Sequence, residues 1–468
     1  MKKALLKFWK KGNILLSKPN ILLLTIDTLR PDRLGCYGFA PSITPNIDRL
    51  AENGIQFTQA ITGGSWTQAA FPVLLTSTFA SMYGGCLGPL AADRPAPINA
   101  LKEGGYSTAG FSTSPLLSRS YGYERSFDDY IDLDPGEKDP WLRTVKGGHK
   151  LLKQPFTHYL AGLMGIRTRP AKIYASAAEL TDQICDWVGN SKGPFFIWGH
   201  YMDVHWPYHL EDSLTDPSRI AQAWKDVVHL HNANWKDERI TSAQMDHYID
   251  LYEKAVSYTD FHLGRLFDFL DMRGLDQNTI IILVSDHGEE FLEHGRWGHW
   301  EDNLYDEILN VPLLIHIPGM REGIVISEQV RTLDLMPTIL ELCECPSPEG
   351  LKGMSLLPLW SGNADKFQPS VAISEMWRDS WHIISVRKGN FKYIWDNKHP
   401  NQTRLYDIES DPEELHNLSF ELPEIVQEYH LQVDEVLIEM ERTMSMQVDT
   451  PELNEEMLSR LRDLGYLQ

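Results

Sequence analysis

The sequence predicts an α/β fold built on a large, mostly parallel, doubly wound sheet with helices on both faces. Three short runs are almost wholly apolar, at residues 21–26, 195–198 and 280–284, and helical patterns lie between them at 44–53 and 171–188. Strands buried on both faces have this continuous apolar pattern, and their alternation with helices is typical of a doubly wound sheet. Ligands of such sheets bind beyond the carboxyl ends of the strands.

The pattern changes along the 468-residue chain and distinguishes four segments. Residues 1–18 form a basic, amphipathic N-terminal segment, and residues 19–364 form the main domain. Within it, residues 134–170 are rich in Pro, Gly and Lys with weak periodicity, which favours a lid or a long insertion. Residues 365–468 form a smaller α+β subdomain. Its expected elements are short strands at 371–373, 382–386 and 391–395 and a closing helix at 423–444.

The charge balance excludes one class of partner. The chain carries 43 Lys and Arg residues against 65 Asp and Glu residues, so its net charge is −22. Such a field repels the nucleic acid backbone. An anionic substrate would therefore need positive charge concentrated at its own site.

The N-terminal segment bears on localisation. Residues 1–18 hold six Lys residues, and no acidic residue precedes Asp27. We expect a solvated terminus, and peripheral contact with an anionic membrane is the alternative. No apolar run is typical of a signal peptide or long enough for a membrane span, and five unpatterned Cys residues favour a reducing compartment. We therefore expect a cytoplasmic protein; the sequence does not indicate its oligomeric state.

Polar residues follow two of the predicted strands. Asp27 ends the first strand, and Asp286 and His287 end the strand at 280–284. Two carboxylates and an imidazole suit Zn²⁺ or Mn²⁺ better than Ca²⁺ or Mg²⁺, which prefer oxygen ligands. The alternative is that Asp286 caps a following helix and His287 hydrogen-bonds locally.

Ordered motifs along the chain resemble those of the sulfatases in the alkaline phosphatase superfamily. The chain opens on DTLRPD at 27–32 and TPNIDRLA at 44–51, and it carries SDHGEEFLEHGRWGH at 285–299. Further matches follow in the family's order: LKEGGYSTAG at 101–110, YMDVHWPY at 201–208, VP at 311–312, DLMPT at 334–338, LYD at 405–407 and LGY at 464–466. The resemblance implies an ester hydrolase with one bound divalent metal, and it makes residues 19–364 the catalytic domain.

The same resemblance locates the nucleophile. Counting back from LLTS at 74–77 places Thr67 at the nucleophile position. Sulfatases that use formylglycine carry Cys or Ser there, with Pro two residues later and Arg four residues later. This chain has Thr67, Ala69 and Phe71 instead. It is therefore similar to the threonine-nucleophile branches, such as the phosphoethanolamine transferases and phosphodiesterases.

The metal ligands and substrate contacts are carried over in the same way. In formylglycine sulfatases the positions of Thr28 and His287 are Asp and Asn, which complete an all-oxygen Ca²⁺ site; here a nitrogen ligand replaces one oxygen. His205 matches a substrate-contacting His, and His299 matches in position a His of the transferases and a Lys of many sulfatases. The predicted catalytic residues are Thr67, His205 and His299; the predicted metal ligands are Asp27, Asp286, His287 and Thr67; and His205, His299, Asp203 and Trp66 are expected to bind substrate. We expect one metal, with a second as the alternative through Asp203, His294 and His382.

The predicted function is hydrolysis of phosphate or sulfate esters through a covalent Thr67 intermediate, with phosphodiesters and phosphonate monoesters favoured. The substrate is expected to be a small molecule, a glycan or a lipid-linked ester. Two alternatives within the superfamily are a transferase that passes the phosphoryl-linked group to a glycan or lipid acceptor, and a sulfuric ester hydrolase that uses Thr67 without formylglycine. A third is a binding protein that retains the fold without turnover.

Overall fold

The computed structural model describes residues 18–133, 174–208, 210, 217–236, 239–300, 302–378 and 380–444. The predicted lid at 134–170 and residues 1–17 of the basic N-terminal segment lie outside the described residues, as does the C-terminal LGY motif.

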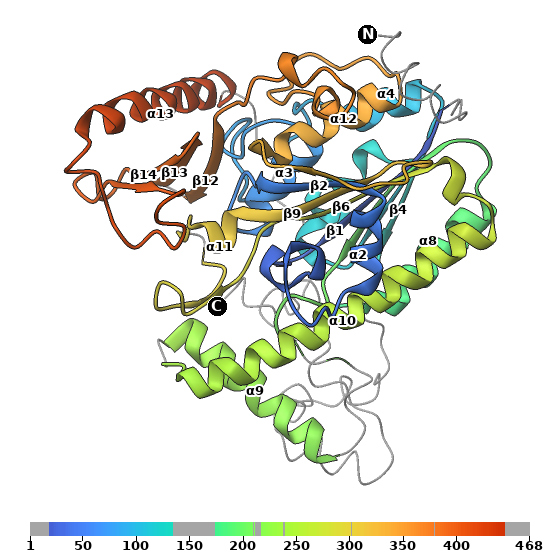
Figure 1. Cartoon of the computed structure of the whole chain (residues 1–468), viewed down its shortest axis with the longest axis horizontal. Helices are drawn as coiled ribbons and strands as arrows, with labels where there is room; N and C mark the ends of the chain where they lie inside the picture. Colours follow the sequence, from blue (N-terminus) through green and yellow to red (C-terminus); the bar gives the residue numbers. More distant parts are fainter. Residues whose placement is uncertain are drawn as a thin grey trace.

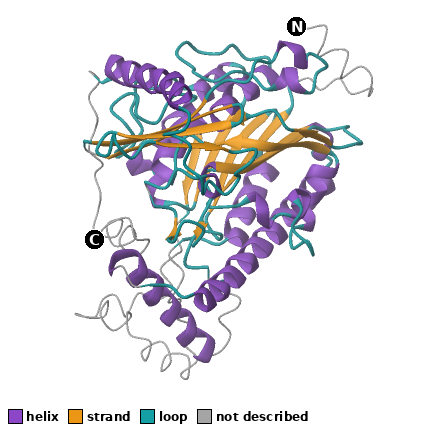
Figure 2. Ribbon diagram, turned by 60° about the vertical axis from the view of Figure 1, so that its left-hand side comes forward, coloured by secondary structure: helices purple, strands orange, loops and turns teal. Residues whose placement is uncertain are grey.

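The centre of the molecule is a nine-stranded sheet (Figures 1 and 2). Five neighbouring strands run parallel, in the order β6, β1, β5, β3, β4, while β9 is antiparallel to both β6 and β2. The strands are β1 (Asn20–Ile26), β2 (Gly54–Ile61), β3 (Ser107–Ser112), β4 (Asp129–Asp132), β5 (Phe195–Tyr201), β6 (Thr279–Ser285), β9 (Asn310–His316), β10 (Ile324–Ile326) and β11 (Val330–Arg331). The predicted α/β class with a mostly parallel sheet is confirmed.

Helices cover both faces of this sheet (Figure 1). Leu22 and Leu24 of β1 pack in one apolar core with α2, α8 and α10, whereas Ile21 and Leu23 pack in the other with α3, α4 and α12. This alternation follows from the two-residue period of a strand, and it makes the sheet doubly wound. The helices are α2 (Pro45–Glu52), α3 (Thr67–Thr76), α4 (Pro97–Glu103), α8 (Ala177–Asn190), α9 (Pro217–Lys236), α10 (Ser242–Met272), α11 (Asp306–Leu309) and α12 (Leu335–Leu342).

A second, four-stranded antiparallel sheet and one long helix form the C-terminal part (Figure 1). The sheet holds β12 (Ala372–Arg378), β13 (Trp381–Lys388), β14 (Phe391–Asp396) and β15 (Arg404–Asp407), and α13 (Pro423–Thr443) packs on it through Tyr429 and Val433. The three predicted strands are therefore present, each longer than expected at one or both ends. A two-stranded ribbon, β7 (Glu290–Phe291) with β8 (Trp297–Gly298), lies in the loop after β6.

The C-terminal sheet contacts the loop that leads into α3. The backbone N–H of Glu375 donates to Gly63 O at 3.0 Å, and the Ser374 hydroxyl donates to Thr62 O at 2.6 Å. Gly63 and Gly64 permit this close packing, because a Cβ on either would lie within 2.5 Å of Val73 or Ala69 on α3. The start of α3 is thus held between the two sheets.

A buried ion cluster joins the two sheets and yields a stability prediction. The ammonium of Lys392 on β14 is fully buried and contacts Asp306 at the start of α11 at 2.9 Å and Glu414 at 2.9 Å. We expect Lys392→Met to lower the free energy of unfolding by about 3–5 kcal/mol, because it leaves the buried Glu414 without its cation and leaves Asp306 with Arg387 alone. Urea unfolding followed by fluorescence measures this.

A surface ion pair provides the matched control for that substitution. Lys388 on the adjacent strand pairs with Glu428 at 2.8 Å, but about half of each side chain is exposed. We expect Lys388→Met to cost about 1 kcal/mol or less. Equal losses in the two variants would show that the buried cluster does not hold the sheets together.

No helix within the described ranges combines the length and the apolar character that are needed to cross a membrane.

Candidate functional site

The site forms at the carboxyl edge of the main sheet. Strands β1 and β6 are neighbours and parallel, with Ile26 opposite Ser285, so the residues that follow them, Asp27 and Asp286, emerge side by side. Asp27, Asp286 and His287 are completely buried, and each offers one ligand atom within 4.8 Å of the others. His287 Nε2 lies 3.5 Å from Asp286 Oδ2 and 3.8 Å from Asp27 Oδ1.

These three residues fit a divalent cation. Both oxygens of Asp27, Oδ2 of Asp286 and Nε2 of His287 are buried and make no hydrogen bond. Buried polar atoms without a partner cost about 1–3 kcal/mol each, so natural sites retain them where a ligand completes the set. The donor set of two carboxylates and an imidazole matches the ligands preferred by Zn²⁺ and Mn²⁺. Asp286 Oδ1 is used otherwise, because it accepts from the backbone N–H of His287 at 2.9 Å.

The pKa values show how burial and neighbouring groups act on the three residues of this group. Burial and the neighbouring Asp27 charge raise the pKa of Asp286 well above its ordinary value. Burial also acts to raise the pKa of Asp27, but His200 and the other nearby imidazoles outweigh it and lower that pKa. Burial lowers the pKa of His287 to about 3, so its imidazole is neutral at pH 7, as a metal ligand must be.

Thr67 is the first residue of α3. The cap position before it is held by Trp66, whose backbone is extended and which provides no side-chain cap. Thr67 is fully buried and its hydroxyl oxygen makes no hydrogen bond, so it does not act as a helix cap. The start of α3 is linked to the metal-ligand group, since the Thr62 hydroxyl donates to Asp286 O at 2.5 Å. A helix N-terminus also favours negative charge, as the alkoxide of the predicted nucleophile would require.

Two further predicted residues gather beside this group. The rings of His287 and His299 lie 4.5 Å apart, and those of His299 and His205 lie 5.0 Å apart. Burial lowers the pKa of His299 to about 4 and also lowers the pKa of His205, each partly offset by the negative charge of Asp27. His205 Nδ1 lies 2.5 Å from Trp206 O, which fixes that nitrogen as a donor. Three contiguous imidazoles therefore border the carboxylates.

The remaining predicted residues fall into two groups. Asp203 is buried in the loop after β5, and Trp66 is buried at the start of α3. His294 instead donates from Nδ1 to Glu307 Oε1 at 3.0 Å and stacks on Tyr305. His382 contacts Glu375 at 3.1 Å on the second sheet. The two histidines considered for a second metal thus have carboxylate partners of their own, and the part of the chain that the structure describes holds a single ligand group of three.

Glu289 is a site residue that the sequence analysis missed. It is completely buried; its Oε1 lies 2.8 Å from His299 Nδ1, and its Oε2 accepts from the Tyr208 hydroxyl at 2.9 Å. Burial raises the pKa of Glu289 to about 7. The contact orients the His299 ring and directs its Nε2 away from Glu289. The only available signal was the position of Glu289 two residues after His287, which does not distinguish it from Glu290.

His200 is the second residue that was missed. It lies in β5, is completely buried, and places Nε2 at 3.4 Å from Asp27 Oδ2. The signal that could have found it is an imidazole near the end of an apolar strand, directly before the YMDVHWPY motif.

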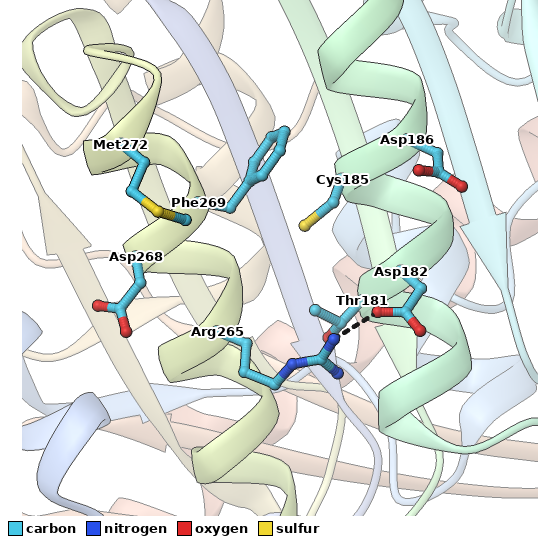
Figure 3. Close-up of a pocket in the computed structure, with 8 residues that line it drawn as sticks. All are labelled: Thr181, Asp182, Cys185, Asp186, Arg265, Asp268, Phe269 and Met272. Atoms are coloured by element: carbon cyan, nitrogen blue, oxygen red, sulfur yellow. Dashed lines mark hydrogen bonds and ion pairs between the residues drawn. The ribbon is translucent and has the colours of Figure 1, made fainter.

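A groove of about 660 Å³ lies elsewhere, between α8 and α10 (Figure 3). Its charged lining is mainly acidic, with Asp182, Asp186 and Asp268 against Arg265, which already pairs with Asp182 at 2.6 Å. None of the predicted site residues lines it. Its negative charge disfavours an anionic ester, so the groove is not the reaction site.

Comparisons with known proteins agree with these motifs. The Sulfatase family model matches residues 19–344, and the model described as N-sulphoglucosamine sulphohydrolase, C-terminal, matches residues 293–442. Arylsulfatase K of Xenopus laevis is 30% identical over 435 residues, which cover 82% of this chain and 76% of that protein. The match to Arylsulfatase K of Bos taurus is 30% identical and covers 87% and 79%. The match to Arylsulfatase K of Homo sapiens is 30% identical over 234 residues, which cover 47% of this chain and 43% of that protein.

Solved structures share the fold. The phosphonate monoester hydrolase of Agrobacterium radiobacter superposes with a TM-score of 0.66 at 21% identity, covering 90% of this chain and 96% of that one. A structure in complex with its substrate, D-glucosamine-2-N,6-O-disulfate, superposes with a TM-score of 0.69 at 18% identity, covering 93% and 100%. The resemblance stated from the motifs is confirmed at the level of the family, whereas the threonine branch stays a prediction. The chain belongs to the sulfatase family and is an ester hydrolase of the alkaline phosphatase superfamily.

Proposed function

We propose that the protein hydrolyses phosphate or sulfate esters through a covalent intermediate on Thr67, with phosphodiesters and phosphonate monoesters as its better substrates. The observation that carries this proposal is the buried, unbonded hydroxyl of Thr67 at the start of α3, at the same sheet edge as Asp27, Asp286 and His287. A hydroxyl held without a partner in the interior is costly unless it has another use.

The residues of the site divide the reaction between them. Asp27, Asp286 and His287 would hold one divalent cation, with Zn²⁺ or Mn²⁺ favoured by the nitrogen ligand. When bound, such a cation lowers the pKa of a coordinated hydroxyl and offsets negative charge on the ester oxygens. Thr67 passes its hydroxyl proton to a neighbouring imidazole as its Oγ1 attacks phosphorus or sulfur in line, and the bond from that atom to the ester oxygen breaks. Water later cleaves the ester on Thr67 and releases the acid.

His299 and His205 serve the charge that develops on the ester oxygens. His299 engages Glu289 through Nδ1, so its Nε2 is the nitrogen that we assign to the substrate. Burial keeps both imidazoles neutral without substrate, and the approach of an anionic ester favours their protonated forms. One of them then returns a proton to the departing oxygen. These imidazoles and the cation provide the local positive charge that a chain of net charge −22 requires.

The comparisons support two substrate classes. Relatives named as arylsulfatases and the complex with a disulfated glucosamine support a sulfated glycan or aryl sulfate, and the phosphonate monoester hydrolase supports a phosphorus ester. We favour phosphorus because Thr67, Ala69 and Phe71 replace the formylglycine pattern. For the alcohol part of the substrate we propose a small molecule, a glycan or a lipid-linked group.

A substrate panel tests this proposal. Purified protein whose bound metal has been identified is assayed with an aryl sulfate, an aryl phosphate, an aryl phosphodiester and an aryl phosphonate monoester. We expect the phosphodiester and the phosphonate to be turned over fastest. Turnover of the aryl sulfate alone would contradict the preference for phosphorus. If none of the four esters is turned over when water is the only acceptor, the transferase or the binding protein is favoured.

The transferase alternative is separated by its products. Both mechanisms form the same ester on Thr67, but in a transferase an alcohol other than water releases it. The panel is therefore repeated with glycerol and with a soluble glycan as acceptors. We expect the free acid to remain the main product in each case, and an acceptor ester as the main product would replace the hydrolase by a transferase.

A further inference from the structure

Four buried side chains form a line that ends at Asp27 Oδ2. Trp198 and His200 lie two residues apart on β5, and the register places Thr25 of β1 opposite His200. Trp198 Nε1 lies 2.9 Å from Thr25 Oγ1, and Thr25 Oγ1 lies 3.0 Å from His200 Nδ1. His200 Nε2 faces Asp27 Oδ2 at 3.4 Å, a contact longer than an ordinary hydrogen bond, and it has no other partner among the residues that the structure describes. All four side chains are completely buried.

The end groups set the direction of these contacts. An indole N–H only donates, so Thr25 Oγ1 accepts from Trp198 and retains its own hydrogen to donate. A carboxylate only accepts, so the nitrogen that faces Asp27 must carry a hydrogen. His200 is then the Nε2–H tautomer, and its Nδ1 accepts from Thr25, which is nearer to this nitrogen than to Gly199 O at 3.3 Å. Each donor therefore points toward Asp27.

The His200 ring is also held by packing. Phe71 meets it edge-on with ring centres 4.9 Å apart, and Trp198 stacks on it at 6.3 Å. Phe71 lies four residues after Thr67 on α3. One imidazole thus contacts both a proposed metal ligand and the helix of the proposed nucleophile, and its neighbours leave it little freedom to rotate.

We propose that His200 is a positioning residue for the cation site. With its Nε2 facing Oδ2 of Asp27 at 3.4 Å, it holds the carboxylate so that Oδ1, the oxygen nearer to His287 Nε2, is presented to the cation. The inference rests on the proposed function only in that the site binds a divalent cation. Within the described residues the ligand group of three does not include His200, so we assign His200 a role through Asp27 and not as a ligand.

The test measures metal affinity and needs no substrate. Apparent dissociation constants for Mn²⁺ and Zn²⁺ are obtained on the full chain by competition with a chromophoric chelator. We expect His200→Leu to bind each metal about 10–100-fold more weakly, the usual effect of losing a group that orients a ligand. His200→Gln retains an N–H donor near the position of Nε2 and is expected to recover most of the affinity. The absorption spectrum of Co²⁺-substituted protein should change in His200→Leu and return toward wild type in His200→Gln.

A pair of hydroxyl deletions tests the orienting contact without touching the imidazole. Thr25→Val removes the donor to His200 Nδ1 and should also weaken metal binding, by less than His200→Leu does. Thr279→Val is the matched control, because this hydroxyl is equally buried but lies at the opposite end of β6, bonded to Asn20 and to Leu275 O. It should leave metal affinity unchanged. If His200→Leu does not fold, His200→Gln and the two Thr variants still decide the question.

The outcomes separate this inference from the proposed reaction. Wild-type metal affinity in His200→Leu overturns the inference, and equal losses in His200→Gln and His200→Leu replace it by direct ligation through the imidazole. A wild-type protein that binds no divalent metal overturns the inference together with the cation site of the proposed function. Weakened binding in His200→Leu alongside a wild type that hydrolyses none of the tested esters supports the inference and counts only against the proposed reaction.

Discussion

Thr67→Ala is expected to lower turnover by about 10⁴-fold or more while leaving the fold intact, because enzymes with a covalent nucleophile lose activity on this scale when it is removed. Its hydroxyl makes no hydrogen bond, so its removal leaves no partner unsatisfied. We therefore expect the melting temperature of Thr67→Ala to match or exceed that of the wild type. Steady-state assays on the best substrate of the panel, together with thermal unfolding, measure the two effects.

Two further variants and one direct measurement complete this test. Thr67→Ser retains a hydroxyl and should keep part of the activity. Thr76→Ala removes a buried hydroxyl at the other end of α3, which donates to Pro72 O at 2.6 Å, and should leave turnover close to wild type. Mass spectrometry of protein quenched with substrate should find the added phosphoryl or sulfuryl group on the peptide that contains Thr67. Full activity in Thr67→Ala would end the covalent mechanism.

Asp286→Asn is expected to have opposite effects on function and on the stability of the metal-free protein. It removes one of the two proposed carboxylate ligands, so the cation is lost. Without the cation the transition state loses several kcal/mol of charge stabilisation, and we expect turnover to fall by about 10³-fold. The wild type treated with a chelator should lose activity to a similar extent and recover it on addition of Zn²⁺ or Mn²⁺. Chelator-treated Asp286→Asn should not recover.

The stability effect follows from the raised pKa of Asp286. Since the folded, metal-free protein holds a proton on this carboxyl at a higher pH than the unfolded chain does, its contribution to stability is full below the ordinary pKa of 3.8 and is lost as pH rises. Asn is neutral throughout and still accepts from the backbone N–H groups of Thr28 and His287. The metal-free variant should therefore melt above the metal-free wild type at pH 7, with the difference vanishing near pH 4.

Thermal unfolding with chelator across this pH range measures the difference. Asp268→Asn, on the exposed side of α10, is the control. The difference in melting temperature between this variant and the wild type should be the same at pH 4 and at pH 7. Added Zn²⁺ or Mn²⁺ should raise the melting temperature of the wild type above that of Asp286→Asn. A metal-free Asp286→Asn variant that is less stable at every pH would mean that Asp286 is charged and paired in the folded protein.

The elements that the sequence predicted well are those with the simplest physical signature. Strands β1, β5 and β6 are buried on both faces, so their apolar runs stand out, and the structure extends them by only one to three residues. The second sheet was predicted with strands that are too short. Strand β12 continues through Glu375, whose carboxylate contacts His382 on the next strand and the backbone N–H of Ser81, 294 residues earlier, so its burial depends on tertiary partners.

The site shows the same division. Asp27, Asp286, His287 and Thr67 follow strands or begin a helix within family motifs, and each could be named from the sequence. Glu289 could not, because its spacing does not distinguish it from Glu290, and for His200 the sequence offered only its place near the end of an apolar strand. Their importance arises from His299, ten residues after Glu289, and from Asp27, more than 170 residues before His200.

By itself the sequence determined the α/β class, the family and the residues that end the central strands. Each of these depends on residues that are consecutive in the chain, either an apolar run or a short motif. Only the tertiary structure decided which polar side chains meet. It brought ligand atoms of Asp27, Asp286 and His287 within 4.8 Å of one another. It also paired His294 and His382 with carboxylates outside this group. Glu289 and His200 contact the residues that we propose they orient, His299 and Asp27. Hydrogen bonds and ion pairs act over a few ångströms between distant segments, so they are set by the packing of the sheets and not by the order of residues.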